Sequence, residues 1–132
     1  MSLTDAVEID LLKAFVGKAT TIFAITVITP HVALYTTAPT ESAVGTEVAG
    51  SSYARQSTPS ATWPTPSAGS VANTTAVLFP AATGSGYTVV GAALCDALSA
   101  GNILRFQAFT GIVIGVGDQL NFPIGAITFT MD

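Results

Sequence analysis

Apolar and polar residues alternate along most of this chain, a pattern typical of β-strands that have one buried face. The C-terminal residues show it best, because Ile127, Phe129 and Met131 alternate with threonines. The same pattern, bounded by turn residues, predicts eight strands. Their expected ranges are Thr21–Thr29, Val32–Thr37, Tyr53–Thr58, Val71–Pro80, Tyr87–Cys95, Ile103–Phe109, Gln119–Phe122 and Ala126–Met131. Eight short strands predict an all-β fold, a β-sandwich or jelly roll.

The beginning of the chain has a helical period instead, with an apolar stripe at four-residue spacing. The stripe consists of Val7, Leu11 and Phe15, and it is flanked by Leu12 and Val16. Thr4 or Asp5 can cap the start of this helix, and Gly17 can end it. At 132 residues the chain suits one domain. We therefore expect a single β-sandwich domain over residues 1–132, with a helical arm at 1–17 and a β module at 18–132.

Two stretches fit neither a strand nor a helix, and loops of their length are usually functional or take part in assembly. They are Ala38–Ser52, rich in small polar residues, and Pro59–Gly69, which contains three prolines. Trp63 lies in the second stretch and is followed by Pro64. Two interpretations of Trp63 remain open. It either covers one end of the sandwich or anchors a subunit interface, where tryptophan is enriched.

The composition points to a subunit of a larger assembly. Apolar residues make up 49% of the chain and charged residues only 9%, against a usual charged share of about 25%. Obligate interfaces between subunits are apolar and poor in charge. We therefore predict a stable homo-oligomer, with a homotrimer as the expected state.

The charge and the cysteine count exclude several classes of partner. The net charge is −4 and the four basic residues form no stripe, so we expect no binding to nucleic acid. Cys95 is the only cysteine, which excludes an internal disulfide. The apolar run Ala19–Tyr35 is interrupted by threonines and Pro30, so we expect no membrane span. Acidic residues near the N-terminus argue against a secretory signal, and we expect a soluble protein.

No set of catalytic residues stands out, so we expect no enzyme, no cofactor and no metal site. His31 is the only histidine and has no carboxylate at ligand spacing. No Gly-x-Ser-x-Gly elbow occurs. A glycosidase pair could still be assembled from the loop acids Glu41 and Glu47, which keeps a cell-wall hydrolase as an alternative.

The segment Gly45–Gln56 reads GTEVAGSSYARQ and resembles the GTEVSGGSYARQ signature of a family of small phage virion proteins, commonly labelled tail fibre proteins. Other blocks resemble the same family in the same order, so that the resemblance covers residues 31–132. These blocks are His31–Thr40, Val71–Thr83, Cys95–Ala97, Gly101–Leu104 and Ile127–Asp132. The chain departs from the family before Tyr87, where a Trp-Gly pair is common, and at Cys95, where an aromatic residue is common.

The resemblance implies a non-enzymatic structural subunit of a bacteriophage particle, located in the virion after assembly in the host cytoplasm. The implied partners are further copies of the chain and other virion proteins, either major capsid or tail proteins. Two roles fit, a capsid decoration (cement) protein and a tail fibre component. A carbohydrate-binding module for host attachment is an alternative, in which Trp63 with Tyr53 or Tyr87 forms an aromatic platform for a host-surface glycan.

Within the signature, Arg55 is one of only two arginines, and we expect it to have a fixed partner. Glu47 and Asp96 are the candidates within the subunit, where a bidentate pair would hold the long loop in place. A pair across a subunit boundary is the alternative. The interface candidates from the sequence are Trp63, Tyr53, Arg55, Glu47 and Pro64.

Overall fold

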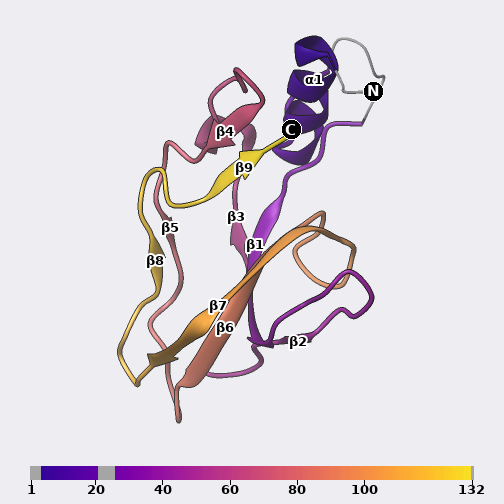
Figure 1. Ribbon diagram of the computed structural model, residues 1–132. Coiled ribbons are helices and arrows are strands. Elements are labelled where there is room, and N and C mark those ends of the chain that lie inside the picture. Colours follow the sequence, from indigo (N-terminus) through magenta and orange to yellow (C-terminus); the bar gives the residue numbers. More distant parts are fainter. Residues whose placement is uncertain (1–3, 21–25, 132) are drawn as a thin grey trace. The chain divides into compact units, whose positions relative to one another are not determined.

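Figure 1 presents the computed structural model of the chain, which describes residues 4–20 and 26–131. The described residues form one α-helix, nine β-strands and a short 3-10 helix. These are α1 (Asp5–Phe15), β1 (His31–Thr37), β2 (Thr46–Glu47), β3 (Gln56–Ser57), η1 (Ser60–Thr62), β4 (Ser70–Ala72), β5 (Val77–Leu78), β6 (Tyr87–Cys95), β7 (Ile103–Ile114), β8 (Asn121–Phe122) and β9 (Thr128–Thr130). The predicted all-β class with a short N-terminal helix is confirmed. The sandwich or jelly-roll arrangement stays a prediction.

The chain divides into two compact units, each built from segments that are far apart in the sequence. The first unit contains the described parts of Met1–Pro30 and Phe122–Asp132, together with Thr58–Val77. The second unit contains His31–Ser57 and Leu78–Asn121. Neither unit is therefore a contiguous stretch of chain.

The second unit is organised around a five-stranded sheet with the order β2-β1-β6-β7, in which β3 also pairs with β1. Strands β1 and β6 are antiparallel, from His31 opposite Cys95 to Tyr35 opposite Gly91. Gly91 is a tight position, because a Cβ there would lie 3.1 Å from the Cβ of Ala38. This glycine lets the chain that follows β1 pack closely on one face of the sheet.

Strand β6 spans Tyr87–Cys95 as predicted, but β7 runs to Ile114 instead of ending at Phe109. The added residues end in a β-branched run, which favours extended backbone. The pairing of β6 with β7 shifts register twice, between Val89 and Gly91 and again at the end of β6. These irregularities let the longer β7 follow the shorter β6.

Helix α1 begins and ends where the sequence predicts. Thr4 is its N-cap residue, although the threonine side chain makes no capping hydrogen bond. Gly17 follows the helix with φ +69°, and a Cβ at this position would overlap the carbonyl oxygen of Ile28. Leu12 and Val16 are fully buried, each one position after a member of the predicted stripe, so the buried face is rotated by one residue. No helix in the described part of the chain is long and apolar enough to cross a membrane.

The rest of the first unit is built around the ribbon of β4 and β9, which places Val71 opposite Phe129. Trp63 packs on Phe129, with ring centroids 5.4 Å apart. Phe129 is 8% exposed, whereas Thr128 and Thr130 are exposed, which confirms the predicted alternation. The other members of the predicted apolar face, Ile127 and Met131, are only half-buried.

Four of the predicted strands are shorter in the structure or lie partly outside its described residues. Of Gln119–Phe122 only Asn121–Phe122 forms a strand, and of Ala126–Met131 only Thr128–Thr130 does. Residues 21–25 of the expected strand Thr21–Thr29 lie outside the described residues, and residues 26–29 form no strand. Of the expected strand Tyr53–Thr58, only Gln56–Ser57 pairs with a neighbour.

The predicted strand Val71–Pro80 is broken at Asn73 into the short strands β4 and β5. The Asn73 side-chain amide donates to the carbonyl oxygens of Thr75 and Pro123, and its Oδ1 accepts the N–H of Ile127. An asparagine that bonds to the backbone in this way competes with a strand ladder. In the sequence, Asn73 and the two threonines that follow it interrupt the apolar residues of this run.

Candidate functional site

The signature segment Gly45–Gln56 lies in the second unit, where it follows β1 and ends at the first residue of β3. Gly45 has φ +69°, and a Cβ there would overlap the carbonyl oxygen of Thr37. Glycine is therefore needed where the loop returns to pair with β1. The N–H of Val48 then donates to the carbonyl oxygen of Leu34 at 2.9 Å, which continues the pairing beyond β2.

Three successive residues with left-handed backbone follow: Gly50, Ser51 and Ser52 have φ +72°, +51° and +62°. Contacts with Thr83 hold this strained turn in place. The N–H of Thr83 donates to the carbonyl oxygen of Ser51 at 3.0 Å, and the hydroxyls of Ser52 and Thr83 lie 2.9 Å apart. This turn positions Tyr53 and Arg55 so that both side chains can bond to Glu47.

Arg55 and Glu47 form a bidentate ion pair within the subunit. Nε of Arg55 donates to Oε1 of Glu47 at 2.8 Å, and Nη2 donates to Oε2 at 2.7 Å. The side chains are 7% and 29% exposed, respectively. The hydrogen bonds from Arg55 hold the pKa of the Glu47 carboxyl below its usual value, although burial acts in the opposite direction. Of the partners considered from the sequence, Glu47 is therefore confirmed.

The remaining amino group of Arg55 fixes a second loop. Nη1 donates to the carbonyl oxygens of Ala97 and Ala100 at 2.7 and 2.8 Å. The alternative partner, Asp96, is engaged elsewhere, because its carboxylate accepts the backbone N–H and the side-chain amide of Asn102. Hydrogen bonds from Asn102 lower the pKa of Asp96. Arg55 therefore links the signature loop to the turn between β6 and β7.

Tyr53 completes the cluster. Its hydroxyl donates to Oε1 of Glu47 at 2.7 Å and accepts the N–H of Leu34 at 3.0 Å. Its ring stacks on Phe79 at a centroid distance of 6.1 Å and meets Tyr87 edge-on at 6.4 Å. Burial is the main cause that raises the pKa of Tyr53, so the phenol stays neutral at physiological pH. The signature residues thus form a hydrogen-bonded cluster at one side of the sheet.

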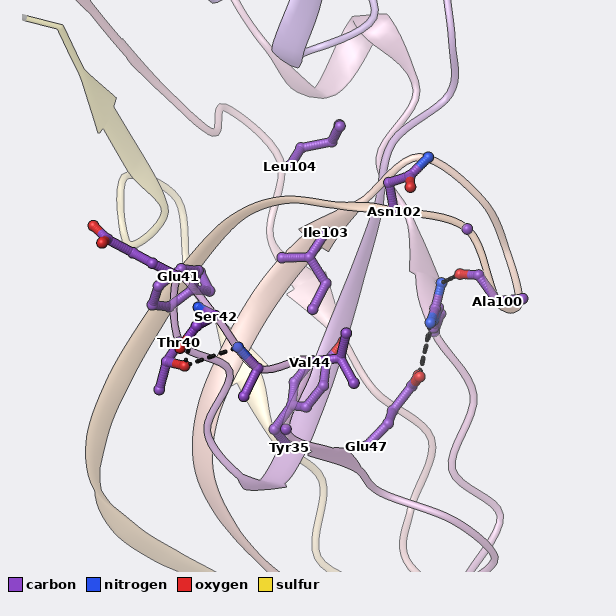
Figure 2. Close-up of a pocket in the computed structure, with 15 residues that line it drawn as sticks. Tyr35, Thr40, Glu41, Ser42, Val44, Glu47, Ala100, Asn102, Ile103 and Leu104 are labelled. Carbon is purple, nitrogen blue, oxygen red and sulfur yellow. Dashed lines mark hydrogen bonds and ion pairs between the residues drawn. The ribbon is translucent and has the colours of Figure 1, made fainter.

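A hollow of about 640 Å³ lies beside this ion pair (Figure 2). Residues 40–45 form one wall, and residues 100–102 form part of another. Figure 2 shows Ile103 pointing from β7 toward Val44 and Tyr35. Beneath the hollow, Tyr35 belongs to a buried cluster against which Ile103 packs. The hollow therefore has an apolar floor.

The polar groups around the hollow are largely bonded to one another. The hydroxyl of Thr40 accepts the N–H of Ala43 at 3.0 Å, and the hydroxyl of Tyr35 lies 3.9 Å from the Cys95 thiol. Burial raises the pKa of that thiol, which keeps it in the neutral form. Val44, by contrast, presents an apolar side chain that is 76% exposed. An uncharged, apolar contact suits this hollow better than a charged ligand does.

The family described as podophage GP4 fiber I protein gp80 matches residues 2–130 of the chain. The match includes segments of both compact units. The chain belongs to this phage fiber family. The resemblance read from the sequence is confirmed, and the match begins earlier than the blocks at residues 31–132 that carried it. No curated protein matches the chain.

As a member of the fiber family, the chain is a structural component of the phage virion. The interface candidates from the sequence fall in different units of this fiber-family chain. Tyr53, Arg55 and Glu47 meet in the ion-pair cluster of the second unit, whereas Trp63 and Pro64 belong to the first. Whether any of them contacts another subunit stays a prediction.

Trp63 is only 2% exposed, whereas Pro64 is exposed. Burial of the ring agrees with the interpretation of Trp63 as a cover over a core. Within the described residues its indole N–H has no hydrogen-bond partner. An aromatic platform for a glycan does not form from Trp63, and the Tyr53 ring is packed against Phe79 and Tyr87.

The two loop acids considered for a hydrolase, Glu41 and Glu47, both line the hollow. Glu47 is unsuited to act as a general acid, because its pKa is lowered and a general acid needs a raised one. Glu41 is exposed at the wall. Among the described residues, no three histidine, cysteine or acidic side chains come together as a possible metal site.

The sequence did not predict the hollow or the exposed apolar side chains of β7. Phe106, Ile112 and Val113 are 40%, 43% and 75% exposed. The sequence signals were the alternation of Leu104, Phe106 and Ala108 with polar residues, and the run Ile112–Ile114 with no polar residue in it. A run of this kind predicts a strand and does not say which of its faces is covered.

Proposed function

We propose that the chain is a non-enzymatic subunit of a tail fibre on the outside of a phage particle. The observation that carries this proposal is the match to a fiber protein family over residues 2–130. The ion-pair cluster supports a structural role, since Arg55 and Glu47 are bonded to each other and to the backbone. The hydrogen-bonding groups of both side chains are used to hold loops in place, so few of them are available to bind a substrate.

The alternative within the virion is a capsid decoration or cement protein. A sequence of 132 residues without a long repetitive stretch suits that role, so it remains a candidate beside the tail fibre. We favour the fibre because the family is described as a fiber protein. On the fibre proposal the chain contacts tail proteins, and on the decoration proposal it contacts the major capsid protein.

We further propose that the chain assembles as a homo-oligomer, with a homotrimer as the expected state. Charged residues make up only 9% of the sequence, and several large apolar side chains are exposed in the single subunit. Both features are typical of a chain whose surface is partly covered by other subunits. Since neither compact unit is contiguous, we expect residues 1–132 to act as one module in this assembly.

The copy number of the chain in purified particles tests the proposed location. Quantitative mass spectrometry of virions, normalised to the major capsid protein, should find a few to a few dozen copies for a fibre subunit. Hundreds of copies would contradict the tail location and favour capsid decoration. A count near zero would contradict the virion role altogether.

A further inference from the structure

The longest strand of the structure, β7, carries an apolar row that is open to solvent. Phe106 pairs with Ala93, and Ile112 pairs with Val89. Directly paired residues of neighbouring strands lie on the same face of a sheet. By this rule Ile103, Phe106, Ala108, Ile112 and Ile114 lie on one face. Ile114 is buried, and we call the other four residues the β7 face. Its exposed members include Phe106 at 40% and Ile112 at 43%.

The β7 face is continuous with the hollow beside the ion pair. Ile103 and Phe106 belong to the β7 face and also line the hollow. The exposed side chain of Val44 lies at the hollow as well. Apolar surface therefore extends from the wall formed by residues 40–45 along β7.

The outer edge of β7 is also open. In the sheet of the described residues, β7 is the terminal strand and pairs only with β6. Natural proteins usually protect such an edge with lysine, proline or a short strand. Strand β7 has twelve residues, contains neither lysine nor proline, and has Arg105 as its one charged residue. Arg105 pairs with Leu94 and so lies on the opposite face.

The length and the charge of this surface fit an interface between copies of the chain. At about 3.4 Å per residue the twelve residues of β7 extend for about 40 Å, and the open edge of the strand offers backbone groups beside the apolar row. The β7 face itself has no formal charge. At the hollow the charges of Arg55 and Glu47 neutralise each other, which leaves the exposed Glu41 as the remaining charged side chain of the lining. A partner for the β7 face must therefore be apolar and uncharged, as the same face of another copy is.

We propose that the β7 face and the hollow are the surface on which a second copy of this chain docks. Copies related by a rotation axis bring the same apolar face toward that axis, so Phe106 and Ile112 of each copy are buried together. This inference rests on the proposed homo-oligomer and adds the surface that forms it.

Substitutions on the two faces of β7 test the proposal in the full-length chain. The double variant Phe106→Ser with Ile112→Ser removes apolar side chains from the β7 face. Val113→Ser is the matched control, because Val113 is more exposed but pairs with Thr88 on the opposite face. Sedimentation velocity over a dilution series should find wild type and control as the same oligomer, and at least a tenfold weaker association for the double variant.

A second experiment does not depend on whether the double variant folds, because it measures how fast maleimide reacts with single cysteines introduced on the two faces of β7. Ala108→Cys places a thiol on the β7 face, and Val113→Cys places one on the opposite face, while Cys95 is buried in both. In the oligomer the thiol at position 108 should react with maleimide at least tenfold more slowly than after dilution to monomer. The thiol at position 113 should react equally fast in both states.

The outcomes separate this inference from the proposed function. If wild type is an oligomer but the double variant associates equally well, or the thiol at 108 is unprotected, the β7 face is not the interface. The same conclusion follows if Val113→Ser weakens association as much as the double variant does. If wild type stays a 13.4 kDa monomer at every concentration, both the inference and the proposed homo-oligomer are wrong.

Discussion

At the scale of single residues, Arg55 connects two loops of the second unit. Its guanidinium bonds to Glu47 on one side and to the carbonyl oxygens of Ala97 and Ala100 on the other. Arginine is suited to this role because its planar fork donates several hydrogen bonds in fixed directions. One side chain thereby holds together the loop after β1 and the turn between β6 and β7.

Glu47→Gln should lower the free energy of unfolding by roughly 1.5–3 kcal/mol, the usual contribution of hydrogen bonds to a charged group. The amide loses the ion pair and can accept at only one of the two positions that Arg55 addresses. Glu41→Gln is the matched control, since Glu41 is exposed at the hollow. Urea denaturation should separate the two variants, and equal midpoints would contradict the role assigned to Glu47.

The same ion pair predicts how stability depends on pH. Because the pKa of Glu47 is lower in the folded chain than its ordinary value of about 4.3, its contribution is complete above that value and is lost as the pH falls through the folded pKa. Thermal melts between about pH 6 and pH 3 should therefore show a steeper acid loss of stability in wild type than in Glu47→Gln. Parallel curves would contradict the assignment.

The ion pair of this cluster could be predicted from the sequence, but the backbone acceptors of Arg55 could not. Arg55 is one of two arginines in a chain with few charges, so we expect it to have an acidic partner. Glu47 is one of the two candidates considered from the sequence. The choice between Glu47 and Asp96 required the structure, because Asp96 is bonded to Asn102. The two carbonyl acceptors of Arg55 could not be predicted, because every residue has a backbone carbonyl.

At the scale of elements, the period-two pattern predicted strands well where one face is buried. Strand β6 matches its prediction at both ends, and in β9 the alternation of Phe129 with exposed threonines is as expected. The pattern failed where a polar side chain bonds to the backbone, as at Asn73. It also failed to predict the full length of β7, whose face is exposed in the single subunit.

Phe129→Ala should destabilise the chain by about 3–5 kcal/mol, since a buried aromatic side chain is lost and Trp63 loses the Phe129 ring on which it packs. Thr128→Ala, at the next position of the same strand, should cost far less because Thr128 is exposed. Chemical denaturation of both variants at one protein concentration measures the difference. Similar losses would mean that the threonine face of β9 is covered too.

At the scale of the whole molecule, the signature segment correctly predicts the class of protein. GTEVAGSSYARQ points to a family of phage virion proteins, whereas the assembly that the 9% share of charged residues favours stays a prediction. The match over residues 2–130 establishes the fiber family. The surface used for assembly could not be predicted, because exposure of β7 depends on how strands from distant segments are ordered in the sheet.

A cryo-electron microscopy reconstruction of the intact phage would show whether this chain is an oligomeric structural subunit of a tail fibre. We expect density for several copies of the second unit's five-stranded sheet in an outer appendage of the tail, with the β7 faces of neighbouring copies turned toward each other. Density for this sheet on the capsid surface, or single isolated copies on the tail, would show that the chain does not have this role.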